Sequence, residues 1–424
     1  MSYKFPQNVH LVAGGMNAII YDLRNKYAIL HWLDSEARLF LNSLINAKHK
    51  GYRAKTKAEK DLLNFLFNNK LIESCNEKAH TKDILEKNGM YNILFAWIEI
   101  TSVCNYRCKH CYGEFGGSSG NSMSENDFSL VLDHLDKLGV NRVQFIGGEP
   151  LSLGFEKIKW FIEKAVYRGF LIEIFTNGYF INDEYVKLFK KNNIRLALSV
   201  YGPNRIHDEI TNHSGSFESL RKAVALLEEH KIEYRLANTR MIDNENINDT
   251  EIAKELNISQ RKLKSDILRL AGRGSLQLLS EKLIKKQLID KDDFKSNRIK
   301  SEYVLKNMQA HNCFRSRIYV SCDLTVYPCV MERRFNYGNI KKSDINKLLE
   351  GGLNYICFIK DKVKICQNCE YRYACFDCRP NSITAKQYDS KPWYCPYDPL
   401  TGTWMAEEKH ISQLVNTKGG DYAN

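Results

Sequence analysis

Short apolar runs and amphipathic helical patterns alternate through the middle of the chain. From Leu94 onward each apolar run is short enough to be a buried strand, and helical periodicity fills the stretches between the runs. Ser124 opens the helical segment 125–138, with Asp127 at the capping-box position. The predicted strands cover residues 94–100, 142–146, 171–175, 194–200, 232–238 and 264–270. Six such strand–helix units predict an α/β fold with a parallel sheet or an open barrel.

A smaller unit precedes these repeats. Its β-branched and aromatic runs are broken at Gly14-Gly15 and Arg24-Asn25, and two helical patterns follow them. This order predicts a small three-stranded sheet with helices. The predicted strands are residues 9–13, 17–24 and 26–32, and the predicted helices are residues 35–48 and 57–69.

The chain changes character again near its end. From His311 it is loop-rich and cysteine-dense, with too little apolar periodicity to fold without additional staples such as bound clusters. The predicted organisation is a domain of residues 1–85, a barrel of residues 90–275, connecting helices at 276–310 and a cysteine-rich domain of residues 311–424.

Three cysteines follow the first predicted strand of the barrel. Reactive groups in such folds lie on loops at the carboxyl ends of strands, and Cys104, Cys108 and Cys111 occupy one such loop. Three thiolates this close can bind three irons of a four-iron cluster and leave the fourth iron open to a small ligand. A zinc site is the alternative, although zinc sites usually pair two C-x2-C units and this loop offers one.

Composition and charge restrict the compartment and the partners. The chain of 424 residues has no apolar run long enough to span a membrane, and its start lacks the layout of a signal peptide. The expected compartment is therefore the cytoplasm, where thirteen clustered cysteines indicate metal binding rather than disulfides. The net charge of +12 suits an acidic peptide, a nucleic acid or simply a lysine-rich surface.

The C-x3-C-x2-C motif, with Tyr112 beside it, resembles the signature of the radical S-adenosylmethionine (radical SAM) superfamily over roughly residues 90–275. The resemblance implies a partial (β/α)6 barrel of the TIM type whose [4Fe–4S] cluster cleaves S-adenosylmethionine to a 5′-deoxyadenosyl radical. It also implies cofactor-binding positions, namely Gly147, Gly148, Glu149 and Pro150 for the amino group, the turn Thr176-Asn177-Gly178, Ser199 for the ribose, and Arg240 or Arg269 for the carboxylate. Ordinary turns and surface arginines are the alternatives at these positions.

The cysteine-rich tail resembles the SPASM domain that follows many peptide-modifying radical SAM enzymes. CQNCEYRYACFDCRP and SCDLTVYPC carry the resemblance. It implies two auxiliary four-iron clusters, the first on Cys313, Cys329 and Cys378 and the second on Cys366, Cys369, Cys375 and Cys395, which makes three clusters in all. The chain departs from the family at Leu324, where a glycine is usual, and in the short spacing before Cys378. Cys322 is the candidate fourth ligand of the first cluster, which otherwise keeps an open iron.

Both ends of the chain resemble maturases of the grasp-with-SPASM peptide systems, through VAGGMNAIIYDLRNKY and KPWYCPYDPLTGTW. The resemblance implies a winged-helix-like domain that captures the leader of a ribosomally made precursor peptide by strand addition. An ATP-grasp ligase and an electron donor such as flavodoxin or ferredoxin are the other expected partners. A cysteine thioether of the sactipeptide or ranthipeptide type is the favoured product, and carbon–carbon crosslinking or epimerisation are the alternatives. Val330 stands where sulfatase-activating members carry an aspartate, which argues against that reaction.

An alternative from another class rests on residues 249–270, which superficially resemble a helix-turn-helix. With the basic charge, this pattern would suit a DNA-binding regulator that carries an iron–sulfur cluster. The same residues serve equally as a helix and the sixth strand of the barrel, so nucleic acid is not an expected partner.

Overall fold

The computed structural model describes residues 2–46, 54–75, 91–117, 119–295, 298–382 and 387–416. The predicted boundary between the first domain and the barrel, at residues 85–90, lies outside these ranges.

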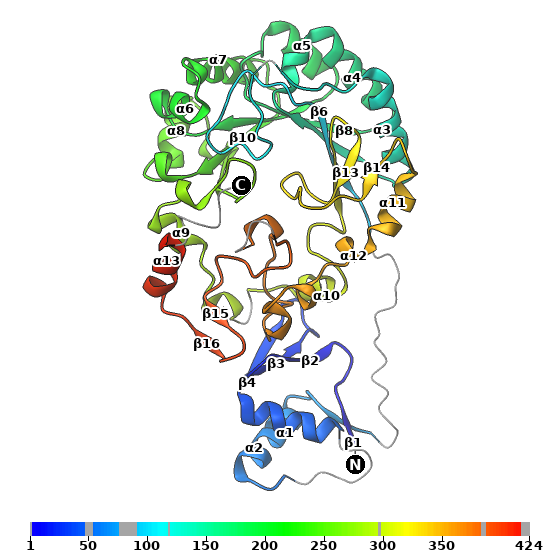
Figure 1. Cartoon of the computed structure of the whole chain (residues 1–424), viewed down its shortest axis with the longest axis vertical. Helices are drawn as coiled ribbons and strands as arrows, with labels where there is room; N and C mark the ends of the chain where they lie inside the picture. Colours follow the sequence, from blue (N-terminus) through cyan, green and yellow to red (C-terminus); the bar gives the residue numbers. More distant parts are fainter. Residues whose placement is uncertain are drawn as a thin grey trace.

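A nine-stranded sheet forms the centre of the molecule, and six of its parallel strands match the six predicted ones. The parallel strands are β6 (Phe95–Thr101), β7 (Arg142–Gly147), β8 (Leu171–Thr176), β9 (Arg195–Val200), β10 (Tyr234–Arg240) and β11 (Leu263–Ile267), side by side in chain order. The helices are α3 (Glu125–Lys137), α4 (Phe155–Tyr167), α5 (Asp183–Lys191), α6 (Asn204–Thr211), α7 (Ser216–Glu229) and α8 (Asp249–Glu255). They lie along the outer side of the curved sheet (Figure 1). This is the open α/β barrel that the periodicity predicts.

Strand alternation divides the barrel into an outer core and an inner wall. On β6, Ala96, Ile98 and Ile100 are fully buried and belong to the core beneath the helices. Trp97 and Glu99 point the other way, because successive side chains of a strand face opposite sides. Phe128 of α3 stacks on Phe161 of α4 with ring centroids 4.3 Å apart, which joins two neighbouring helices over the sheet.

The sheet continues into the segment that the sequence assigns to the cysteine-rich domain. Strand β12 (Arg317–Val320) pairs parallel with β6, and β13 (Thr325–Tyr327) and β14 (Gly338–Asn339) extend the sheet with antiparallel pairing. Strands of two to four residues are too short for periodicity to reveal them. The cysteine-rich tail is therefore joined to the barrel through a shared sheet.

The helix-turn-helix interpretation of residues 249–270 is wrong. Helix α8 ends at Glu255, and the residues that would form a recognition helix instead make strand β11, in parallel register with β10. Leu263 is buried in the barrel core by this pairing. The segment therefore forms the edge strand of the sheet and provides no second α-helix to place in a DNA groove.

The N-terminal unit has the predicted strands and helices. Strands β2 (Val9–Ala13), β3 (Ala18–Asp22) and β4 (Ile29–Leu33) form an antiparallel sheet in that order, followed by α1 (Ser35–Asn46) and α2 (Lys57–Asn68). A further pair, β1 (Ser2–Lys4) with β5 (Glu73–Cys75), is antiparallel. The three-stranded sheet lies against the cysteine-rich tail, where the Tyr21 hydroxyl donates to the Glu370 carbonyl at 2.7 Å (Figure 1).

The remaining elements are short and connected by loops. They are α9 (Glu281–Gln287), α10 (Ser301–Gln309), α11 (Ile345–Gly351), α12 (Leu353–Ile356), β15 (Tyr397–Asp398), β16 (Thr403–Trp404) and α13 (Glu407–Asn416). No helix in the described part of the chain combines the length and the apolar character needed to cross a bilayer.

Candidate active site

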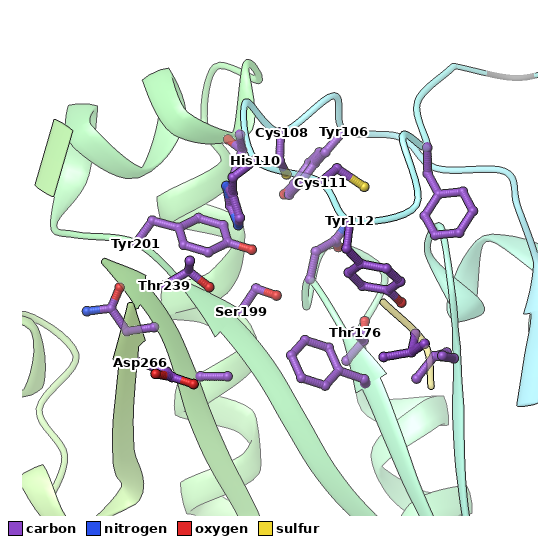
Figure 2. Close-up of a pocket in the computed structure, with 18 of the residues that line it drawn as sticks. Tyr106, Cys108, His110, Cys111, Tyr112, Thr176, Ser199, Tyr201, Thr239 and Asp266 are labelled. Atoms are coloured by element: carbon purple, nitrogen blue, oxygen red, sulfur yellow. The ribbon is translucent and has the colours of Figure 1, made fainter. Parts of the chain in front are cut away.

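A cavity of about 460 Å³ opens at the carboxyl ends of the parallel strands, beneath the cysteine loop (Figure 2). Its wall brings together ten of the residues that the sequence analysis singles out. They are Cys104, Cys108, Cys111, Tyr112, Gly147, Gly148, Thr176, Asn177, Ser199 and Arg269. The predicted cysteine loop and the predicted cofactor-binding turns therefore face one space, as the rule for strand ends requires.

The cysteine loop is braced by a segment that the sequence analysis missed. The Arg273 guanidinium donates to the Cys108 carbonyl at 2.9 Å and to the Phe115 carbonyl at 2.7 Å, and the Arg273 amide donates to the Cys111 carbonyl at 3.0 Å. Gly272 precedes it at φ +55°, where a Cβ would lie 2.4 Å from the Cys111 carbonyl oxygen. The run Ala-Gly-Arg-Gly after the last barrel strand was the available signal for this close contact.

The loop thiols lie in a poorly solvated place. Burial raises the pKa of the Cys104 thiol to about 12, although the Tyr106 amide donates to its sulfur at 3.4 Å, and burial also raises the pKa of Cys108. Metal ligands must be deprotonated, so iron binding here has to displace protons. Among the described residues, no three Cys, His, Asp or Glu side chains converge on the point where a single ion would sit, and the three loop thiols instead border the cavity. The donor set and the adjoining space fit an iron–sulfur cluster with one open position.

Gly147 and Gly148 permit the closest approach between the second strand and the cysteine loop. A Cβ on Gly147 would lie 1.9 Å from the Thr101 carbonyl oxygen, and a Cβ on Gly148 would lie 2.1 Å from the Val103 carbonyl oxygen. The amide of Gly148 donates to the Thr101 carbonyl at 2.8 Å. The sequence predicts that these glycines allow a ligand to approach the backbone closely. In the structure, their lack of a Cβ also allows the backbone of the cysteine loop to pack against them.

Glu149 has a different orientation from the expected one. Its side chain is fully buried and does not line the cavity. The carboxylate accepts from the Leu151 amide at 3.0 Å, the Thr176 hydroxyl at 2.6 Å and the Asn177 amide at 2.7 Å, and burial raises its pKa to about 7. Glu149 thus ties the end of β7 to the end of β8, rather than facing a ligand ammonium. Pro150 begins the buried 3-10 turn that follows.

An aromatic wall stands opposite the glycines. Tyr201 stacks on His207 with ring centroids 5.4 Å apart, and His110 packs edge-on against Tyr201 at 4.5 Å (Figure 2). The Tyr201 amide donates to His207 Nδ1 at 3.1 Å, and burial lowers the pKa of His110 and of His207 to about 4. Both imidazoles are therefore neutral near pH 7. These three residues belong to no motif in the sequence, although Tyr201 follows Ser199 by two positions at the same strand end.

The two candidate arginines occupy different places. Arg269 lines the cavity and pairs with Asp266 at 2.7 Å. Arg240 instead pairs with Asp249 and donates to the Asn244 carbonyl at 3.0 Å. Arg240 is not among the residues that line the cavity, so of these two candidates it is Arg269 that could meet a bound carboxylate there.

The tail cysteines gather in two groups, as the resemblance implies. Cys366, Cys369, Cys375 and Cys395 line one small cavity. The other group consists of Cys313, Cys329 and Cys378. Burial raises the pKa of Cys378 and Arg269 lowers it. The thiols of Cys329 and Cys313 are close enough to raise it further. Cys322 is not brought to either group; its thiol donates to the Glu99 carbonyl at 3.2 Å, in the barrel.

The turn around Leu324 forms despite the missing glycine. Leu324 adopts φ +69°, a conformation that favours glycine, and its side chain is buried in the barrel core. Its amide donates to the Ser321 carbonyl at 2.9 Å. Burial of the leucine offsets the backbone strain, which is of order 1–2 kcal/mol.

Comparison with known proteins agrees with this geometry. The description of the radical SAM superfamily matches residues 98–256, and that of the SPASM iron–sulfur cluster-binding domain matches residues 313–370. The antilisterial bacteriocin subtilosin biosynthesis protein AlbA of Bacillus subtilis is 30% identical over 182 residues, 42% of this chain and 40% of AlbA. The cysteine-type anaerobic sulfatase-maturating enzyme of Clostridium novyi is 30% identical over 154 residues, 32% of this chain and 40% of that enzyme. The chain thus spans about 40% of the length of these two relatives.

The fold also has solved counterparts. The crystal structure of Streptococcus suis SuiB bound to precursor peptide SuiA superposes with a TM-score of 0.53 at 15% identity, over 92% of this chain and 98% of SuiB. A sulfatase-maturating enzyme structure, anSMEcpe with bound AdoMet, gives a TM-score of 0.54 at 18% identity, over 76% of this chain and 98% of that one. Both likenesses establish the shared fold.

Replacing Gly148 with alanine tests the contact between the glycine turn and the cysteine loop. The added Cβ would collide with the Val103 carbonyl and approach Cys104 Cβ to 2.9 Å, so the loop must shift. We expect Gly148→Ala to cost roughly 1–3 kcal/mol of stability and to lower the iron content of reconstituted protein. Gly351→Ala, where a Cβ meets nothing within 4 Å, is the matched control. Equal thermal stability and iron content in both variants would contradict the assignment.

His207 predicts a loss of stability in acid. Its folded pKa of about 4 lies below the ordinary histidine pKa of 6.5, so the unfolded chain takes up the proton first as the pH falls. Folded stability is therefore intact above pH 6.5 and should drop by about 2 kcal/mol at pH 5 through this residue. Thermal unfolding at pH 7 and pH 5 measures the drop, which should be smaller in His207→Asn. An identical pH dependence in the variant would refute the prediction.

Proposed function

The chain belongs to the radical SAM superfamily and carries a SPASM domain, and on that premise we propose that it is a peptide maturase. The proposed enzyme generates a 5′-deoxyadenosyl radical and modifies a ribosomally made precursor peptide, most favourably by forming a cysteine thioether. The observation that carries the proposal is the convergence of Cys104, Cys108 and Cys111 on the strand-end cavity, together with two further thiol groups in the tail.

Cys104, Cys108 and Cys111 would hold the cluster beside the cavity. When bound, the cluster and S-adenosylmethionine supply reductive cleavage of the cofactor, which yields the radical. The chain's own residues bind and orient the cofactor: Gly147 and Gly148 offer close backbone approach, and Ser199 offers a hydroxyl. The buried aromatic wall of Tyr201, His110 and His207 excludes water from the same space.

A thioether requires an electron acceptor. Joining a peptide carbon to a cysteine sulfur breaks one C–H and one S–H bond and forms one C–S bond. The carbon's hydrogen atom passes to the 5′-deoxyadenosyl radical, and the thiol's hydrogen leaves as a proton and an electron. The two sets of tail cysteines would each hold an auxiliary cluster that can accept that electron. Together with the cluster on the barrel loop, this gives three clusters.

The small N-terminal sheet supplies a surface for the precursor peptide. Strand β3 lies between β2 and β4, so each outer strand has one edge without a described partner strand. Such an edge can add a peptide strand through main-chain hydrogen bonds. The net charge of +12 suits an acidic leader. The precursor SuiA in the SuiB structure supports peptide binding by this class of fold.

Other chemistries begin with the same radical. Carbon–carbon crosslinking and epimerisation share its opening steps and are the second candidates. Some relatives are named as sulfatase-maturating enzymes. That reaction is disfavoured because Val330, which lines the cavity, stands where the resemblance places an aspartate in sulfatase-activating enzymes. A flavodoxin or ferredoxin would supply the reducing electron, and an ATP-grasp ligase would be a partner enzyme.

The cluster count is tested by iron and sulfide analysis of anaerobically reconstituted protein. We expect about twelve irons in the wild type and about eight in the Cys104/Cys108/Cys111→Ala triple variant. The variant should also lose production of 5′-deoxyadenosine from S-adenosylmethionine after dithionite reduction. Cys357→Ala is the control cysteine variant and should keep both values. Bound zinc without deoxyadenosine formation in the wild type would overturn the proposal.

The product is tested with a short cysteine-containing peptide, chosen from reading frames that neighbour the gene for this chain. Co-expression should yield peptide that has lost two hydrogens and one alkylatable thiol for each crosslink, measured by mass spectrometry after iodoacetamide treatment. Modified peptide that keeps every thiol free would rule out the thioether and favour carbon–carbon crosslinking or epimerisation.

A further inference from the structure

A buried lysine stands at the second cysteine group of the tail. Lys360 lines the same small cavity as Cys366, Cys369, Cys375 and Cys395, and only 5% of its surface is exposed. Its ammonium donates to the Cys375 sulfur at 3.0 Å. Lysines are almost never buried to this extent without an anionic partner. The groups around Lys360 therefore indicate which anion it binds.

Asp377 is a buried carboxylate whose charge also acts on Lys360, but its ion pairs are with other cations. Asp377 pairs with Arg379, whose guanidinium is itself fully buried, and lies 3.6 Å from His311 Nε2. Another carboxylate, Glu370, accepts a hydrogen bond from the Tyr397 hydroxyl, and its negative charge acts on Cys369. The Cys375 sulfur is therefore the direct hydrogen-bond acceptor of the Lys360 ammonium. Burying an ammonium beside a neutral thiol would be costly, whereas an anionic cluster on the four cysteines would stabilise it.

We propose that Lys360 raises the reduction potential of the auxiliary cluster held by Cys366, Cys369, Cys375 and Cys395. A fixed positive charge, hydrogen-bonded to a ligand sulfur, stabilises the reduced cluster, which carries one more negative charge than the oxidised cluster. This makes the cluster a better acceptor for the electron that thioether formation releases. The inference rests on the proposed function only in requiring a cluster on these four cysteines.

Lys360→Met tests the inference because methionine keeps the unbranched length of the side chain and removes the charge. In full-length reconstituted protein, a potentiometric titration followed by electron paramagnetic resonance should show one cluster with a more negative midpoint. We expect at least a tenfold change in its reduction equilibrium, about 59 mV for one electron. Lys360→Arg, which keeps the charge, should remain near the wild-type potential. Lys362→Met removes the same charge from an exposed position two residues away and should leave all potentials unchanged.

The outcomes distinguish failure of the Lys360 proposal from failure of the proposed function. Full iron content in Lys360→Met with unchanged midpoint potentials overturns the Lys360 proposal. Loss of about four irons in both Lys360 variants also overturns it, because it would show that Lys360 serves to pack the site. Loss of about four irons in Lys360→Met but not in Lys360→Arg supports it, because arginine keeps the positive charge that methionine lacks. A wild type with about four irons in total would instead refute the three-cluster proposal.

Discussion

The close contact between the glycine turn after β7 and the cysteine loop after β6 is the constraint on which the site depends. There is no room for a Cβ at Gly147 or Gly148, and the Glu149 amide donates to the Val103 carbonyl at 2.8 Å. Glu149 then extends the same contact to β8 through its buried carboxylate. Three neighbouring strand ends are thereby held together, so the thiols and the cofactor-binding turns border one cavity.

The barrel and the cysteine-rich tail share structure rather than meeting at a linker. Strand β12 pairs directly with β6, the strand that leads into the cysteine loop. From β13 the chain soon reaches Val330 and Met331, which line the cavity beside Cys329 of the first tail group. The geometry of the tail thiols is therefore tied to the active-site wall by a few residues of backbone, which is the arrangement an electron acceptor near the reaction requires.

The sequence predicted what depends on local pattern and missed what depends on contacts made across the fold. The six strands in chain order follow from the alternation of short strand runs with helical patterns. The barrel thiols were identified by their spacing, and the tail thiols by the resemblance to the SPASM domain. The glycines around Arg273 indicate a close contact but not its partner, and Tyr201 lies in no motif, because an arginine clamp and an aromatic stack exist only after distant segments meet. Glu149 was assigned to a ligand since a carboxylate beside glycines suggests one, yet its partners are the amides and hydroxyl of its own fold. Leu324 shows that burial can hold a residue in a glycine-like conformation.

The N-terminal sheet contacts the loop that carries the second set of tail cysteines, so the two parts are structurally coupled. Between Cys369 and Cys375, Arg372 donates to the Ala13 carbonyl of β2 at 2.9 Å and pairs with Asp361 at 2.6 Å. Tyr21 and Tyr371 belong to one apolar cluster with Cys375 itself. Formation of the second tail group and docking of the N-terminal sheet therefore stabilise each other, because each orders residues that the other contacts. A peptide captured on that sheet would be held by the part of the chain that also holds the proposed electron acceptor.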